Sequence, residues 1–137
     1  MSGVHVHLRV GAERYALPVE DVRSIVDMEG LTPVLGMPPS VLGLRPLDGA
    51  LLPVFDLAAA LGVAGGRLAR IVVVESDGAG AAGLGVDDVV EVAPLPALEQ
   101  DGAAGPLRGS ALLDGTLVGA VDLGAVLERL ETELAAA

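Results

Sequence analysis

The sequence of 137 residues has no cysteine and no tryptophan, and its aromatic side chains are limited to Tyr15 and Phe55. Without cysteine, disulfides, thiolate catalysis and cysteine-based zinc sites are excluded. So few aromatic rings argue against the stacking platforms that bind single-stranded nucleic acid. The core must therefore be built from valine, leucine, isoleucine and alanine.

Lysine is also absent, so all eight basic residues are arginines, and they face 19 acidic residues. The resulting net charge of −11 repels phosphate backbones and anionic lipid surfaces. Nucleic acid and anionic membranes are therefore poor partners for this chain.

Long hydrophobic runs are missing, although 52% of the residues are apolar. The longest stretch without charge, residues 30–44, contains Pro33, Pro38 and Pro39, whereas a membrane-spanning helix needs about 20 apolar residues in succession. The N-terminus shows no signal-peptide pattern. We therefore expect a cytoplasmic protein with no segment inserted in a membrane.

What the sequence does contain is a series of short segments typical of strands. Val4, Val6, Leu8 and Val10 alternate with polar residues, which is the period of a half-buried strand. Asp-Gly pairs at 48–49 and 114–115 separate apolar runs and predict tight hairpins. We predict strands at 4–10, 15–19, 22–26, 41–47, 50–55, 70–75, 83–86, 89–92, 110–113 and 116–121. Two helices are expected, one at 57–61 and an amphipathic one at 123–135.

The chain also repeats itself. The segment 47–57 matches 113–123, and 17–22 matches 84–89 at nearly the same offset along the chain. Two copies of one small unit explain both matches, and each unit has about five short strands and a terminal helix. We therefore predict one domain, 1–137, made of two packed five-stranded barrels at about 4–62 and 69–127, with the C-terminal helix at about 123–135.

Three motifs are similar to ligand-binding or metal-binding sites. The glycines of 78–83 match a dinucleotide-binding fingerprint, but the residues after them do not form an amphipathic helix, so a hairpin loop is the preferred interpretation. His5 and His7 could share a metal but are interpreted as solvent-facing residues on an edge strand. Asp87, Asp88 and Glu91 are interpreted as a solvated face rather than a calcium site.

No nucleophile, base and orienting group come together in the sequence, so we expect no enzyme, no metal and no cofactor. The alternative function is a small-molecule or nucleotide-binding module that uses the loop from Gly78 to Gly83.

The order and spacing of several weak motifs resemble the CheW-like family, the coupling proteins of bacterial chemotaxis. The motifs lie at 15–22, 31–34, 43–49, 52–57, 70–75 and 83–89, so the resemblance covers nearly the whole chain. It implies two SH3-like β-barrels in a mainly β fold. It also implies an adaptor that links the cytoplasmic tips of chemoreceptors (methyl-accepting chemotaxis proteins) to a CheA-type histidine kinase.

The resemblance further implies a partner-binding groove, for which the candidate residues are Val22, Ser24, Gly43, Leu44 and Asp48. Three positions depart from the family pattern. Pro46 stands where the family has asparagine, Asp48 where it has arginine, and Ser24 where it has an acidic residue. A charge reversal at Asp48 would repel a carboxylate that an arginine would bind, so the receptor as partner is left open.

Overall fold

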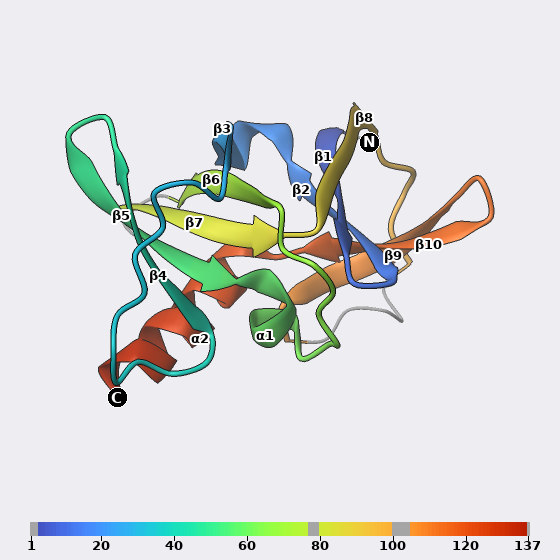
Figure 1. Cartoon of the computed structure of the whole chain (residues 1–137). Helices are drawn as coiled ribbons and strands as arrows, with labels where there is room; N and C mark the ends of the chain where they lie inside the picture. Colours follow the sequence, from blue (N-terminus) through green and yellow to red (C-terminus); the bar gives the residue numbers. More distant parts are fainter. Residues whose placement is uncertain (1–2, 77–79, 100–104, 137) are drawn as a thin grey trace.

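The computed structural model describes residues 3–76, 80–99 and 105–136. Strands dominate these residues (Figure 1). The first repeat contributes β1 (Val4–Val10), β2 (Glu13–Pro18), the 3₁₀ helix η1 (Val19–Asp21), β3 (Val22–Asp27), β4 (Val41–Leu47), β5 (Ala50–Asp56) and α1 (Leu57–Leu61). The second repeat contributes β6 (Arg70–Ser76), β7 (Gly80–Val86), β8 (Asp88–Pro94), β9 (Leu107–Leu113), β10 (Thr116–Val121) and α2 (Leu123–Ala135). The prediction of a mainly β fold is confirmed.

Within the described residues the strands form two five-stranded sheets, in the orders β8-β1-β2-β10-β9 and β3-β6-β7-β5-β4. If β1 to β5 are exchanged for β6 to β10, one order becomes the other. The two repeats therefore exchange strands: each sheet contains two strands of one repeat and three strands of the other. The sheets do not coincide with the continuous halves 4–62 and 69–127, because the parallel pairs β5–β7 and β2–β10 join the two repeats.

Backbone geometry confirms that the repeats are equivalent. Asp48 and Asp114 have positive φ angles of 50° and 49°, and the glycines that follow them share 81° and 80°. Gly43 and Gly109, which precede these turns at the same distance in each repeat, have φ angles of 149° and 155°. Both Asp-Gly pairs thus form the hairpin turns that the sequence predicted.

A core of aliphatic side chains lies between the two sheets. It joins inward residues of β1 and β2 to those of β6 and β7, with Leu8, Leu17, Val72 and Leu84 fully buried. The apolar face of α2 completes this core with four buried side chains, Leu123, Val126, Leu127 and Leu130. Smaller clusters fill each sheet's own concave side. The β-branched residues suit the pleated, half-buried surface of these strands.

The helices begin and end where the sequence predicted. The carboxylates of Asp56 and Asp122 accept hydrogen bonds from the amides of Ala58 and Ala125, and Gly62 ends α1 in the left-handed conformation. In the part of the chain that is described, no helix is both long enough and apolar enough to span a bilayer. The β4–β5 and β9–β10 hairpins project from opposite ends of the molecule (Figure 1).

Candidate protein-binding surface

A hollow of about 500 Å³ lies on the concave side of the sheet β3-β6-β7-β5-β4. We call it the β3–β5 hollow. It is lined by Arg23, Ser24, Leu47, Asp48, Ala50, Leu51, Leu52, Val73 and Ala81. Residues of β3, at one edge of the sheet, and of the β4–β5 hairpin, at the other edge, thus face one space. The sheet must curl for its two edges to meet in this way, as an SH3-like sheet does.

Two of the five candidate residues, Ser24 and Asp48, line this hollow. Ser24 is exposed on β3, and Asp48 is exposed at the tip of the β4–β5 hairpin. Asp48 occupies the same turn conformation as Asp114 in the other repeat, so the turn alone accounts for its backbone. Its carboxylate forms no ion pair within the described residues. Pro46 is exposed and pairs with Leu51 across the hairpin.

The other three candidates lie outside the hollow. Val22 is half-buried opposite Val74 and packs against the core between the sheets. Gly43 and Leu44 lie where β4 meets the preceding loop, and the backbone of Leu44 exchanges hydrogen bonds of 2.8 and 2.9 Å with Thr32. A Cβ atom on Gly43 would lie 2.2 Å from the Thr32 carbonyl oxygen, so this position needs glycine for close backbone approach.

Sequence reasoning missed Arg23 and Leu51 as hollow residues. Leu51 is 64% exposed, an unusual state for a leucine with buried apolar neighbours. Its equivalent in the other hairpin, Leu117, is exposed to the same extent, so this exposure is common to both hairpins. Arg23 forms an ion pair with Glu75 at the rim. The hollow therefore has an apolar floor, a compensated cation on one side and the free carboxylate of Asp48 on the other.

The sheet β8-β1-β2-β10-β9 carries different side chains at the equivalent position. Where Ala81 leaves space, the other repeat has Arg14, which is half-buried with its Nε shielded from solvent. Where Val73 forms the floor, it has His7, which is fully buried. Larger and more polar side chains thus occupy the equivalent volume.

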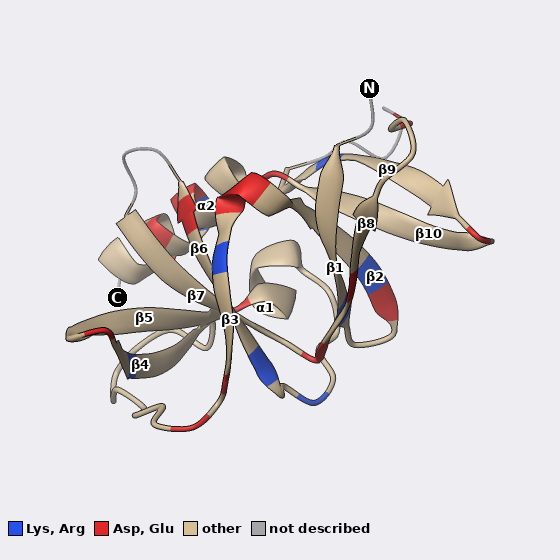
Figure 2. Ribbon diagram, turned by 90° about the horizontal axis from the view of Figure 1, so that it is seen from above, with Lys and Arg blue, Asp and Glu red and all other residues tan. Residues whose placement is uncertain are grey.

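A second exposed surface lies where the two sheets meet. Ile25 on β3 pairs with Val72, and Val92 on β8 pairs with Val6, so both extend the face of the central core into solvent. Their side chains are 41% and 57% exposed, and Val19 on η1 is 40% exposed. Because η1 contacts both β1 and β6, these residues follow the junction of the sheets. We call Val19, Ile25 and Val92 the junction patch; η1, β3 and β8 lie along one side of the molecule (Figures 1 and 2).

Carboxylates dominate the charged positions around these surfaces. Figure 2 shows acidic residues on η1 and at the tips of both hairpins, with few basic residues between them. Burial raises the pKa of the Asp56 carboxyl, with a further contribution from nearby Asp87, against the lowering effect of its helix-cap hydrogen bonds. Burial and the hydrogen bond to Glu13 raise the pKa of the Tyr15 hydroxyl to about 12. Neither group faces the β3–β5 hollow.

The interpretation of the two histidines as solvent-facing residues on an edge strand is wrong. The strand β1 lies between β8 and β2, so it is not an edge strand. His7 is fully buried, and its Nε2 lies 3.1 Å from the Ala93 carbonyl oxygen. His5 is half-buried. No group of three side chains able to hold a metal occurs among the residues that the structure describes.

The solvated face predicted for the acidic cluster is also wrong in one residue. Asp87 is only 6% exposed. Its two carboxylate oxygens accept hydrogen bonds from the amides of Gly11 and Arg67, at 2.8 and 2.6 Å. The carboxylate therefore joins the β1–β2 turn to the loop before β6. Asp88 and Glu91 are exposed, as predicted.

The glycine motif is part of a hairpin. Gly78 lies outside the described residues, but Gly80 and Gly83 belong to β7, which pairs along its length with β6. The strand continues to Val86 and is followed by β8. The residues after Gly83 therefore do not form the helix N-terminus on which a dinucleotide site depends.

Comparison with known proteins agrees with this architecture. The family model of the CheW-like domain matches residues 5–131. A probable chemotaxis protein CheW from Rhizobium etli is 29% identical, with 95% of this chain and 90% of that protein covered. The chemotaxis protein CheW of Rhizobium meliloti is 28% identical over the same shares. The crystal structure of the scaffolding protein TtCheW from Thermoanaerobacter tengcongensis matches with a TM-score of 0.74 and 27% identity, over 90% of this chain and 86% of that one.

A family model that covers almost the whole chain, together with the shared fold, decides the assignment. The matched proteins are chemotaxis scaffolds rather than enzymes. The chain belongs to the CheW-like domain family and is a non-enzymatic scaffold protein of chemotaxis.

Proposed function

We propose that this chain couples chemoreceptors to a CheA-type histidine kinase in the cytoplasm, and that the receptor tip binds along β3. The observation that carries the proposal is the position of β3 between two exposed surfaces. Ser24 faces the β3–β5 hollow, and the next residue, Ile25, belongs to the junction patch. A receptor helix laid along this edge strand would meet apolar side chains in both places.

The charge of Asp48 supports a preference among receptors. The hollow has an uncompensated carboxylate at its rim, where the family pattern has an arginine. A partner with a basic residue at the facing position would be favoured, and one with an acidic residue would be repelled. The effect on affinity is modest, because exposed charge pairs contribute about 0.2–1 kcal/mol.

Titration of receptor-tip fragments against Asp48→Arg and Asp48→Asn tests this proposal. We expect Asp48→Arg to strengthen binding to a tip with an acidic contact residue and to weaken binding to the native tip. Both changes should shrink as salt rises, because the Debye length falls from about 10 Å at 0.1 M to about 3 Å at 1 M. Asp114→Arg is the matched control, since Asp114 has the same turn conformation at the opposite end of the molecule.

Equal affinities of the receptor tip for wild type and both Asp48 variants would show that Asp48 only forms the turn.

The role of β3 in receptor binding is tested separately by Ile25→Asp, which places a charge in the junction patch without replacing a buried side chain. Retention of full receptor affinity by Ile25→Asp would exclude β3 as the receptor-binding strand. Capture of a CheA-type kinase fragment by the same variant would show that the scaffold is folded and that only the receptor arm is affected.

A further inference from the structure

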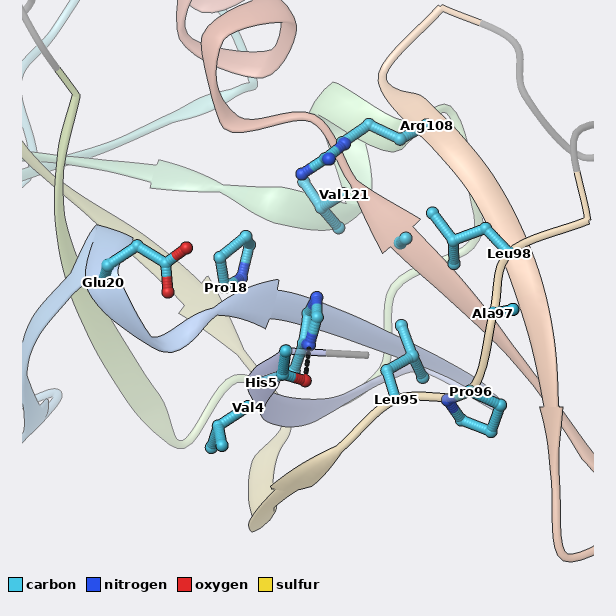
Figure 3. A pocket seen from close by; sticks show the side chains of 12 residues that line it. Val4, His5, Pro18, Glu20, Leu95, Pro96, Ala97, Leu98, Arg108 and Val121 are labelled. Atoms are coloured by element: carbon cyan, nitrogen blue, oxygen red, sulfur yellow. Dashed lines mark hydrogen bonds between the residues drawn. The ribbon is translucent and has the colours of Figure 1, made fainter. Parts of the chain in front are cut away.

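A second cavity, of about 210 Å³, lies on the sheet β8-β1-β2-β10-β9 and has no place in the proposed receptor site. We call it the β1–β9 pocket. Its walls come from β1, the end of β2, η1, the segment after β8, β9 and β10 (Figure 3). The residues that matter here are His5, Glu20, Leu95, Leu98, Arg108 and Val121.

The repeat explains how Arg108 comes to face this pocket. Val41 pairs with Phe55 and Gly43 with Val54, so Leu42 is the extra residue of a bulge in β4. In the same way Leu107 pairs with Val121 and Gly109 with Ala120, so Arg108 is the extra residue of the equivalent bulge in β9. Bulges redirect a side chain out of the regular alternation of a strand. Both repeats therefore direct this side chain toward the same place in their own sheet.

The two repeats place different residues there. Leu42 packs against the cluster formed by Leu52, Val54, Ile71 and Val73, and its Cδ1 lies so close to Gly85 that a Cβ there would be 2.8 Å away. In the other sheet Arg108 takes the position of Leu42. His5, which pairs with Pro18, takes the position of Ile71, which pairs with Gly85. One sheet fills this space with two aliphatic side chains, and the other replaces both with basic residues and keeps a pocket.

The pocket joins one cationic group to apolar walls. Arg108 is exposed and forms no ion pair among the described residues, although the chain has 19 acidic residues to its eight arginines. Leu95 and Val121 are each only 1% exposed and form an apolar base, with Leu98 beside them. Glu20 lies on the η1 side of the pocket, across from Leu95 and Leu98, and the His5 Nδ1 lies 2.7 Å from the Gly3 carbonyl oxygen (Figure 3).

The volume limits the ligand. Pockets for drug-sized ligands and nucleotides occupy about 300–1,000 Å³, whereas an engineered cavity of about 150 Å³ holds benzene. A volume of about 210 Å³ therefore suits one side chain or a molecule of that size. A guanidinium binds a carboxylate through two parallel hydrogen bonds.

We propose that the β1–β9 pocket binds a carboxylate carried on a small branched aliphatic group. The carboxylate pairs with Arg108, the aliphatic group contacts Leu95, Leu98 and Val121, and Glu20 repels a carboxylate placed at the η1 side of the pocket. The ligand is either a free amino or fatty acid of this size or the last residue of a peptide chain. The proposal is independent of the receptor site, because no residue that lines the pocket belongs to the β3–β5 hollow or to the junction patch.

Amide chemical shifts of the full chain, followed during titration with 4-methylpentanoate, test the proposal. A ligand of about eight heavy atoms should bind with a dissociation constant on the order of 1 mM, and the shifts should centre on β1, β9 and the segment after β8. The uncharged 4-methylpentanamide should bind at least tenfold more weakly. Arg108→Leu, which restores the residue of the other repeat, should abolish binding, and Arg70→Leu, at an exposed arginine of β6 in the other sheet, is the matched control. Arg108→Gln serves as a second variant if Arg108→Leu does not fold.

Two further ligands distinguish the sources of the carboxylate. Tight binding of N-acetyl-leucine indicates a peptide C-terminus, whereas tight binding of leucine that is lost in Glu20→Gln indicates a free amino acid, and both results support the site. Binding of the amide as tight as that of the acid would overturn the proposal. So would unchanged binding by Arg108→Leu, or the absence of saturable shifts in the wild-type pocket.

Discussion

Substitution of Asp87 by asparagine should destabilise the protein far more than the same change at its neighbour Asp88. The Asp87 side chain is 4% exposed, and each of its oxygens accepts one backbone hydrogen bond, from Gly11 and from Arg67. Asparagine has a single acceptor oxygen. Its side-chain NH₂ group, a donor, would face the backbone N–H that now donates to the second carboxylate oxygen. Asp88 is exposed and accepts only from the amide of Val89.

The magnitude follows from these two bonds. A hydrogen bond to a charged group contributes about 1.5–3 kcal/mol, and a buried donor left without a partner costs about 1–3 kcal/mol. Asp87→Asn retains one bond and loses the other, so we expect a loss of about 2–4 kcal/mol in the free energy of unfolding. Arg9 adds little to this figure, because its guanidinium is 3.8 Å away and half exposed.

Urea denaturation followed by far-UV circular dichroism measures the difference. With a denaturant slope of about 2 kcal/mol per molar, Asp87→Asn should lower the unfolding midpoint by about 1–2 M, while Asp88→Asn stays within about 0.5 kcal/mol of wild type. If the two variants unfold at the same urea concentration, the Asp87 carboxylate does not hold the two loops together. The slope should be the same for all three proteins, since the surface exposed on unfolding is the same.

Three other substitutions probe the fold in the same denaturation assay. Leu127→Ala should cost about 2–5 kcal/mol, because this side chain of α2 is 4% exposed in the central core, and a loss below about 0.5 kcal/mol would contradict the packing of the helix. Gly43→Ala should be severely destabilising, because the new Cβ would meet the Thr32 carbonyl oxygen at 2.2 Å, whereas Gly124→Ala, at an exposed helical position where the nearest atom is 3.5 Å away, should be mild; equal effects would contradict the close approach. The raised pKa of Asp56 means that the folded state binds its proton more tightly, so the stability that this proton gives is present at low pH and lost as pH rises from 3.8 through the folded pKa. Asp56→Asn, which still accepts from Ala58, should therefore gain stability relative to wild type between pH 4 and pH 7, and an unchanged difference across that range would refute the burial argument.

Much of the fold could be predicted because the local patterns of strands, turns and helix caps agreed with the internal repeat. The hairpin turns at Asp48 and Asp114, the helix caps at Asp56 and Asp122 and the alternation in β1 all depend on local chemistry, which the sequence displays directly. The exchange of strands could not be predicted. The nearly constant offset between the matching segments identifies equivalent positions, but it does not say whether the second neighbour of β7, beside β6, comes from its own repeat or, as β5 does, from the other.

Both errors arise because burial depends on segments that are distant in the sequence. Alternation placed His5 and His7 on the face opposite Val6, but it could not show that His7 on this face is fully buried. In the same way nothing near Asp87 in the sequence reveals donors at Gly11 and Arg67, which are 76 and 20 residues away.

The candidate surface was predicted only in part. Ser24 and Asp48 came from the family resemblance, and both line the hollow. Gly43 is needed for the close approach to the backbone of Thr32. The family pattern alone does not distinguish such a structural glycine from a partner-binding residue. Arg23 and Leu51 carry no distinctive local pattern, and their role depends on how the sheet curls to bring its two edges together.

The exchange of strands also sets the order in which the chain can fold as it leaves the ribosome. The sheet β3-β6-β7-β5-β4 has all its strands once Val86 has emerged, whereas the other sheet must wait for Val121. Until Pro94 has emerged the β1–β2 hairpin has neither of its outer neighbours, β8 and β10, and both its edges offer unpaired backbone groups; the β2 edge stays unpaired until β10 follows. The nascent protein therefore passes through a stage in which one sheet is complete while the apolar β1–β2 hairpin still has unpaired edges. At this stage a chaperone or a strand of a second nascent chain would bind the hairpin.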